Sequence, residues 1–156
     1  MSTDAIHKQV LLRATRERVW RAISDSKEFG HWFGVKFEGP FPAGATVKGV
    51  ITPTKVDAVV AESQKPHEGT AFEIEVETIE PEHKLSFRWH PYGCPSDAPT
   101  LVTFTLEDAD DGVLLIVTES GFDQIPIERR AKAFEMNEGG WAAQMTLIEK
   151  YLALEG

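Results

Sequence analysis

The chain has 156 residues, enough to bury a sizeable core, and we expect residues 1–156 to form a single domain. Its formal net charge of -9 disfavours nucleic acid and anionic membrane surfaces as partners, because both need a basic footprint. No apolar run approaches the roughly 18 residues that span a bilayer, and MSTDAIHKQVLLRA lacks an apolar signal core, so we expect a cytoplasmic protein without stable membrane association.

The first part of the chain predicts a strand followed by two short helices. The stretch IHKQVLLRA is rich in residues that favour β-strands. The apolar stripe of RERVWRAIS predicts a helix, and Thr15, directly before it, is predicted to be its N-cap. The segment DSKEFGHWFG predicts a second helix, which is capped by Asp25 or Ser26 and ends near Gly34.

From Val35 to Ser120 the pattern changes to a period of two residues, which is typical of an antiparallel sheet with one buried face. Strands are predicted in ATVKGVIT, AFEIEVETIEP and HKLSFRWHP, and TLVTFTLEDADDGVLLIVTESGF predicts a hairpin with DADDG as its turn. The segment KVDAVVAESQKPHEG is ambiguous, and we expect a short strand and an exposed loop there.

Alternation within these strands predicts which face of the sheet is covered. Glu73, Glu75 and Glu77 alternate with apolar residues and mark the solvent-exposed face. The face that needs a cover carries an aromatic row, formed by Phe72, Phe87, Trp89 and Phe104.

The segment from about Ile127 to Leu154 predicts one long helix, the only one long enough to supply this cover. Its apolar stripe consists of Phe134, Trp141, Met145, Ile148 and Leu152. The stripe extends backwards to Glu138, where an apolar residue is expected and a charge is present.

Four stretches, ATRERVWRAISD, FGHWFG, VTFTLEDADDGVLLIVTESGF and NEGGWAAQMTLIEKYL, together extend over nearly the whole chain. In this order they resemble the START-like, or SRPBCC, superfamily, and within it the branch named after the activator of the heat-shock chaperone ATPase. The resemblance implies an α+β helix-grip fold, in which a curved antiparallel sheet grips the long C-terminal helix with an apolar cavity between them. It implies less about function, because the superfamily includes lipid carriers, hormone receptors, aromatase/cyclases and co-chaperones.

Gly139 and Gly140 interrupt the long helix directly before Trp141. An interior glycine costs a helix roughly 0.5–1 kcal/mol relative to alanine. We therefore expect the pair to remove side chains where the helix passes over the cavity or approaches the sheet. The alternative is that the glycines ease a bend or a packing contact around a filled core.

The sequence thus predicts a protein that binds a small hydrophobic or aromatic molecule in this cavity, without a cofactor. Aromatic side chains are the main candidates for its lining. The alternative is that these rings only fill the core, which we accept for Trp20. The predicted ligand-binding residues are Trp32, Phe37, Phe41, Phe72, Phe87, Trp89, Phe104, Glu119, Phe134, Glu138, Trp141 and Met145.

Two carboxylates leave an enzymatic alternative open, of the cyclase or hydratase kind. Glu119 is in register with the apolar residues of its strand, and Glu138 lies on the apolar stripe of the long helix. Carboxylates in an apolar chamber can serve as acid and base. The competing interpretation is that Glu138 lies at the helix edge and that Glu119 pairs with an arginine such as Arg88 or Arg129.

The rest of the sequence offers no catalytic group and no metal site. Cys94, the sole cysteine, lies in the loop HPYGCPSDAP without a third group to orient it as a nucleophile. No two of the five histidines have the i, i+4 spacing of a helical metal site. A third class of function is an interaction domain that modulates a chaperone ATPase, for which the sequence indicates no surface.

Overall fold

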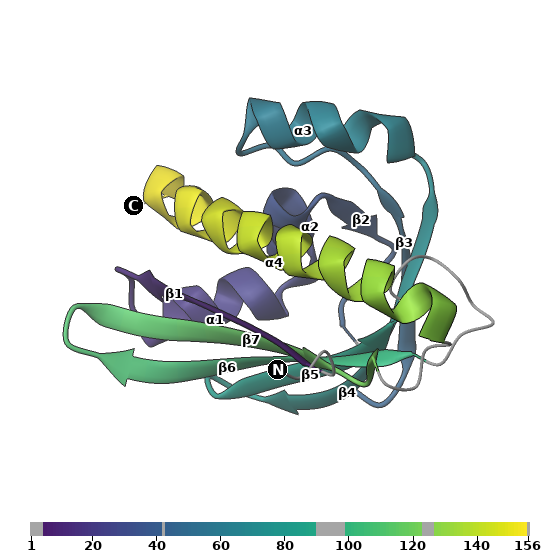
Figure 1. The fold of residues 1–156 in the computed structure, drawn as a ribbon. Coiled ribbons are helices and arrows are strands. Elements are labelled where there is room, and N and C mark those ends of the chain that lie inside the picture. Colours follow the sequence, from purple (N-terminus) through teal and green to yellow (C-terminus); the bar gives the residue numbers. More distant parts are fainter. Residues whose placement is uncertain (1–4, 42, 90–98, 123–126, 156) are drawn as a thin grey trace.

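The computed structural model describes residues 5–41, 43–89, 99–122 and 127–155 (Figure 1). In these residues the elements, in chain order, are β1 (Ala5–Leu12), α1 (Arg16–Ser24), α2 (Ser26–Phe33), β2 (Val35–Phe37), β3 (Thr46–Ile51), α3 (Ala58–Gln64), the short 3-10 helix η1 (Lys65–His67), β4 (Ala71–Glu80), β5 (Lys84–Trp89), β6 (Thr100–Ala109), β7 (Gly112–Ser120) and α4 (Ile127–Glu155). None of the described helices combines the length and the apolar character that crossing a membrane requires.

The strands form one antiparallel sheet in the order β1-β7-β6-β5-β4-β3-β2. The sheet curves, and α4 lies across its inner side together with α1 and α2 (Figure 1). Helix α4 packs against β1 at one sheet edge and against α2. This arrangement confirms the predicted α+β helix-grip fold.

The ends of the two short helices follow from their capping residues. The Thr15 side chain accepts a hydrogen bond from the Arg18 backbone N–H, as predicted for α1. Asp25, rather than Ser26, caps α2 by accepting from two backbone N–H groups of its first turn. Helix α2 ends at Gly34, whose φ of 99° lies in the left-handed region that favours glycine.

Helix α3 replaces the strand and loop that we expected after β3. Asp57 caps this helix by accepting a hydrogen bond from the Val60 backbone N–H at 3.0 Å. At the other end, the Gln64 side chain accepts from the Thr54 N–H at 2.7 Å and donates to the Phe33 carbonyl at 3.2 Å. These capping and tertiary hydrogen bonds override the strand preference of the β-branched residues in this segment.

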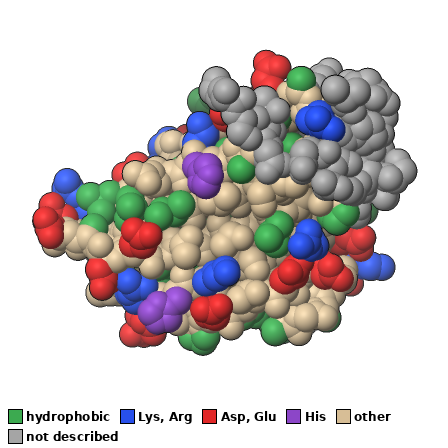
Figure 2. All heavy atoms as spheres, turned by 60° about the horizontal axis from the view of Figure 1, so that its bottom comes forward, with side chains coloured by type: hydrophobic (Ala, Val, Ile, Leu, Met, Phe, Trp, Pro, Cys, Tyr) green, Lys and Arg blue, Asp and Glu red, His purple; other side chains and the backbone are tan. Residues whose placement is uncertain are grey.

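Alternation in the strands gives the two faces that were predicted. Ile74 and Val76 are buried, whereas Glu73, Glu75 and Glu77 are exposed. On the outer face, acidic and basic side chains are scattered over the surface in Figure 2, which looks towards the underside of the sheet in Figure 1. The inner face of β7, uncertain from sequence, is formed by Val113, Leu115, Val117 and Glu119.

Helix α4 buries the predicted stripe with one correction. Trp141, Met145 and Ile148 are buried, but Glu138 is exposed and does not face the sheet. The inward position is taken instead by Asn137, which is four residues before Trp141 and therefore lies on the same helix face. Glu138 is displaced from this face by about 100° and meets solvent.

Three helices meet at Glu28 of α2. Its carboxylate pairs with Arg18 at 2.8 Å and Arg21 at 2.7 Å, both on α1, and accepts a hydrogen bond from the Tyr151 hydroxyl of α4 at 2.9 Å. Burial, followed by the hydrogen bond to Glu28, raises the pKa of Tyr151. This cluster holds the C-terminal half of α4 against the two short helices.

Gly139 and Gly140 are exposed, and a Cβ atom added to either would meet none of the described atoms within 4 Å. The expectation that they allow a close approach to the sheet is therefore wrong. Replacing both with alanine should stabilise the protein by about 1–2 kcal/mol, because alanine is the better helix former. Chemical unfolding followed by tryptophan fluorescence measures this gain.

Gly30 provides a matched control for this prediction. It also lies inside a helix, but its added Cβ would fall 1.9 Å from the Val35 carbonyl oxygen. We therefore expect Gly30→Ala to lower the unfolding midpoint while the double variant raises it. A double variant less stable than the wild-type protein would contradict the solvent-exposed placement of the pair.

Candidate functional site

Glu119 is a charged residue whose side chain is fully buried, with 0% of its surface exposed. It lies on the inner face of β7, between Ile6 of β1 and Val102 of β6. The register predicted from the two-residue period of β7 is thus confirmed, and the carboxylate points at the space between the sheet and α4. An isolated charge in such a place costs several kcal/mol unless hydrogen bonds replace water.

Four neutral side chains supply these hydrogen bonds. The Oε1 atom of Glu119 accepts from the Trp141 indole N–H at 2.8 Å and from the Asn137 amide at 2.9 Å. The Oε2 atom accepts from the Trp89 indole N–H at 2.7 Å, from the Thr100 hydroxyl at 2.5 Å and from Asn137 at 3.0 Å. These five residues are called the Glu119 cluster below, and they come from β5, β6, β7 and α4.

Of the two arginines considered as partners, Arg88 pairs with Glu77 on the outer side of the sheet, and the side chain of Arg129 lies outside the described residues. Indole and amide N–H groups can only donate, so both oxygens of Glu119 serve them as acceptors. Among the described side chains, only neutral donors reach this carboxylate.

Aromatic rings surround this charge. Trp89 and Trp141 stack with their ring centroids 5.6 Å apart, and Phe104 meets Trp141 edge-on at 5.7 Å. Phe33 of α2 lies 6.0 Å from both tryptophans, although the sequence did not single it out. Phe33 follows Trp32 in a short amphipathic helix, and this position could have indicated it as a site residue. The sequence pattern pointed to Trp32 instead.

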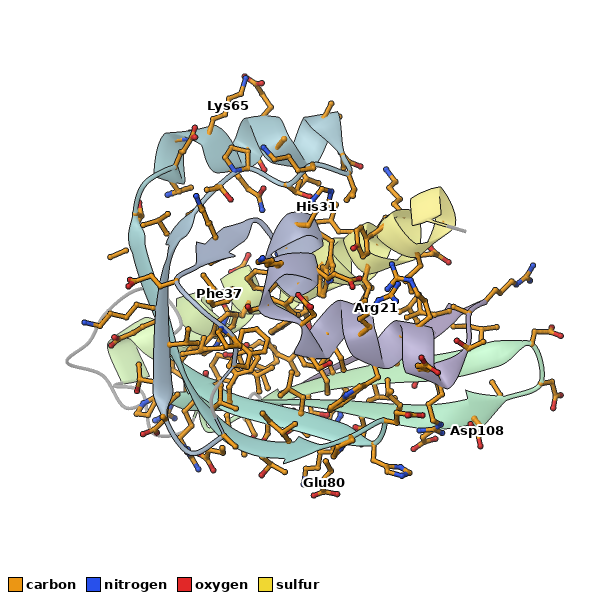
Figure 3. The ribbon with its side chains drawn as sticks, turned by 180° about the vertical axis from the view of Figure 1, so that it is seen from behind. Arg21, His31, Phe37, Lys65, Glu80 and Asp108 are labelled. Atoms are coloured by element: carbon orange, nitrogen blue, oxygen red, sulfur yellow. The ribbon has the colours of Figure 1, made fainter. Side chains whose placement is uncertain are left out.

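Trp32 itself lies apart from the cluster. Its indole N–H donates to the Ala22 carbonyl at 2.9 Å, and its side chain is fully buried between α1 and α2. Phe37 and Phe41 pack on Phe29, at centroid distances of 6.0 and 5.6 Å. Figure 3 shows Phe37 at the edge of the crowded interior, on the strand beside α2.

The other predicted residues are distributed along the interior. Phe87 is buried next to Trp89 at 5.3 Å, Phe134 packs on Phe122 at 5.3 Å, and Met145 is buried one turn beyond Trp141. Ring contacts thus occupy much of the space where an open cavity was expected. The Phe72 side chain, Cys94 and His90 lie outside the described residues.

Residues 13–153 match the family described as Activator of Hsp90 ATPase homolog 1-like protein. The chain belongs to this family. Comparison with curated proteins gives no match.

Solved structures support the fold of this Activator of Hsp90 ATPase homolog 1-like chain. DynU16, from the dynemicin biosynthetic locus, is 25% identical to this chain, with a TM-score of 0.70. The match covers 96% of this chain and 47% of DynU16, so this chain spans about half the length of DynU16. MLL2253 from Mesorhizobium loti is 23% identical with a TM-score of 0.72, covering 97% and 98% of the two chains. The Aha1 dimer from Colwellia psychrerythraea is 15% identical with a TM-score of 0.69 over 95% of each chain.

Glu119→Gln should destabilise this family member. A glutamine replaces one carboxylate oxygen with an NH2 donor. If the NH2 takes the place of Oε1 it faces the Trp141 indole N–H, and if it takes the place of Oε2 it faces the Trp89 indole N–H. Neither indole can accept a hydrogen bond. We expect the free energy of unfolding to fall by about 1–3 kcal/mol, the cost of leaving buried polar groups unpaired. Equilibrium unfolding in guanidinium chloride measures the loss.

Glu138→Gln is the matched control, because the same substitution is made at an exposed position of α4. Its effect on the free energy of unfolding should stay within about 0.5 kcal/mol. If the two variants are equally stable, the hydrogen bonds to Glu119 do not contribute as described.

Proposed function

We propose that this protein binds a small aromatic or otherwise apolar molecule between the sheet and α4, at the Glu119 cluster. The helix-grip fold supports a ligand-binding domain in general. The observation that carries the proposal is the fully buried Glu119 carboxylate, which is surrounded by aromatic rings and, among the described side chains, is held by neutral donors. Apolar sites with a few placed polar groups are the usual architecture for binding such molecules.

The carboxylate gives the ligand a preferred chemistry. A phenol or another aromatic molecule with one hydrogen-bond donor can replace Trp89 or Asn137 as a donor to Glu119. Its ring then takes the place of one partner in the Trp89–Trp141 stack. Aromatic pairs of this kind favour offset or edge-on contacts with centroids about 4.5–7 Å apart.

Trp89 is the ring best placed to move. It is only half-buried, whereas Trp141 is 2% exposed and contacts the rings of Phe33, Phe104 and Trp89. Trp89 is also the last residue of β5, so its displacement leaves the strand pairing of that element intact. A ligand that enters beside Trp89 avoids the cost of opening the deeper core.

Binding is better supported than the acid/base alternative. That alternative relied on Glu119 or Glu138 as a cavity carboxylate. Glu138 is exposed and does not line the interior, so one of the two candidate carboxylates is removed.

The test compares naphthol with naphthalene, which differ by one hydrogen-bond donor. We expect both to quench tryptophan fluorescence saturably, and naphthol to bind about tenfold more tightly because it donates to a charged acceptor. The amides whose chemical shifts change should be those of Thr100, Asn137 and Trp141. Absence of saturable binding by the folded wild-type protein would refute the proposal.

Trp89→Phe sharpens the same test. The variant keeps a ring but removes one donor to Glu119, so the preference for naphthol over naphthalene should increase. Trp20→Phe is the control, since Trp20 packs against the core from α1 and makes no contact with the Glu119 cluster in the described residues. An unchanged preference in Trp89→Phe would show that the ligand does not reach the carboxylate.

The family match supports a second candidate, an interaction that modulates a chaperone ATPase. If the protein acts in this way, the ATP hydrolysis rate of purified Hsp90 should rise as the protein is added and then level off at saturation. A rate that stays constant with the protein in excess would contradict this candidate and leave the small-molecule proposal untouched.

A further inference from the structure

A separate surface pocket of about 390 Å³ lies between α2, β2 and the segment that follows β3. It does not include any residue of the Glu119 cluster. Three lysines stand around it: Lys27 on α2, Lys36 on β2 and Lys55 after β3. We call this space the lysine pocket. Figure 3 labels two residues of its wall, His31 and Phe37, on α2 and β2.

Short backbone contacts fix the walls of the lysine pocket. The Thr52 N–H donates to the Gly34 carbonyl at 3.0 Å, and the Lys55 N–H donates to the His31 carbonyl at 3.3 Å. On the other side, Gly30 lets α2 approach β2 so closely that a Cβ there would overlap the Val35 carbonyl. The three walls are thus held to each other by main-chain groups, and the pocket is a built feature of the fold.

The charge around the pocket has one sign. No aspartate or glutamate is among the described lining residues, and all three lysines are exposed. None of the three forms an ion pair with a carboxylate within the described part of the chain. This concentration of ammonium groups stands out in a protein whose formal net charge is -9. Such a local field attracts a small anion.

The floor of the pocket is apolar. Val35 is buried, Phe37 is half-buried, and Pro53 adds a third apolar surface. The His31 ring, which also lines the pocket, packs against Tyr151 with 5.4 Å between the centroids. A bare inorganic anion would leave the apolar floor unused, whereas a neutral apolar molecule would leave the ammonium groups unused.

We propose that the lysine pocket binds a small amphipathic anion, a carboxylate carried on an apolar and preferably aromatic body. The apolar body lies on Phe37 and Pro53, and the carboxylate faces the lysines. Because these ammonium groups remain in water, each contributes modestly to affinity, and binding weakens as salt is added. This site is independent of the proposed ligand at the Glu119 cluster.

Titration with naphthoate, followed by amide chemical shifts, tests the proposal. We expect saturable shifts at Gly30, Phe37 and Lys55, and weaker binding of the neutral analogue naphthamide. The double substitution Lys36→Gln and Lys55→Gln should weaken naphthoate binding about fivefold, as expected for two exposed charge pairs. Lys48→Gln is the control, because Lys48 is an exposed lysine on β3 that does not line the pocket.

Four results would overturn the proposal. If naphthamide binds as tightly as naphthoate, the negative charge of the ligand does not contribute to affinity. Inorganic phosphate producing the same shifts with the same affinity would indicate general attraction of anions. Equal weakening by Lys48→Gln would indicate an effect of net charge. Shifts confined to Thr100, Asn137 and Trp141 would place naphthoate at the Glu119 cluster, which would support the proposed function instead of this site.

Discussion

Helix α4 is joined to the sheet by the buried negative charge of Glu119, beside which the described side chains place no cation. Such a charge is tolerated only if its oxygens are fully hydrogen-bonded, since water cannot reach it. Glu119 meets this condition by drawing donors from β5, from β6 and from helix α4. Because two of the donors are indoles, the same requirement places Trp89 and Trp141 against each other. The polar contact therefore determines how the surrounding rings pack.

Much of the fold and part of the site could be predicted from the sequence. The period of two in β7 placed Glu119 on the same face as Leu115 and Val117, because adjacent residues of a strand face opposite sides, but it left open which face is the inner one. Its partners could not be predicted, since they lie far apart in the chain and meet only through sheet register. On α4 the seven-residue pattern favoured Glu138, and only the contact of Asn137 with Glu119 shows which residue turns inward. Helix α3 escaped prediction because the tertiary contacts of Gln64 outweigh local strand preference.

Helix α2 contributes to both candidate sites. Near its C-terminal end, the Phe33 ring contacts the two tryptophans of the Glu119 cluster. Lys27 and Gly30 of the same helix line the lysine pocket. The Phe33 carbonyl accepts from Gln144 of α4 at 3.2 Å as well as from Gln64 of α3. One eight-residue helix thus separates an interior that holds a negative charge from a surface that carries positive ones.

The order of the strands also has a consequence for how the protein is made. The first strand, β1, pairs only with β7, so that Ala5 lies opposite Ser120 and Leu12 opposite Val113. A ribosome releases β1 long before β7, and during that interval the other strands can pair with their neighbours in sequence. Joining segments so far apart carries a loop-closure cost that neighbouring hairpins avoid. The edge of the sheet where α4 packs is therefore completed only after nearly the whole chain has been synthesised.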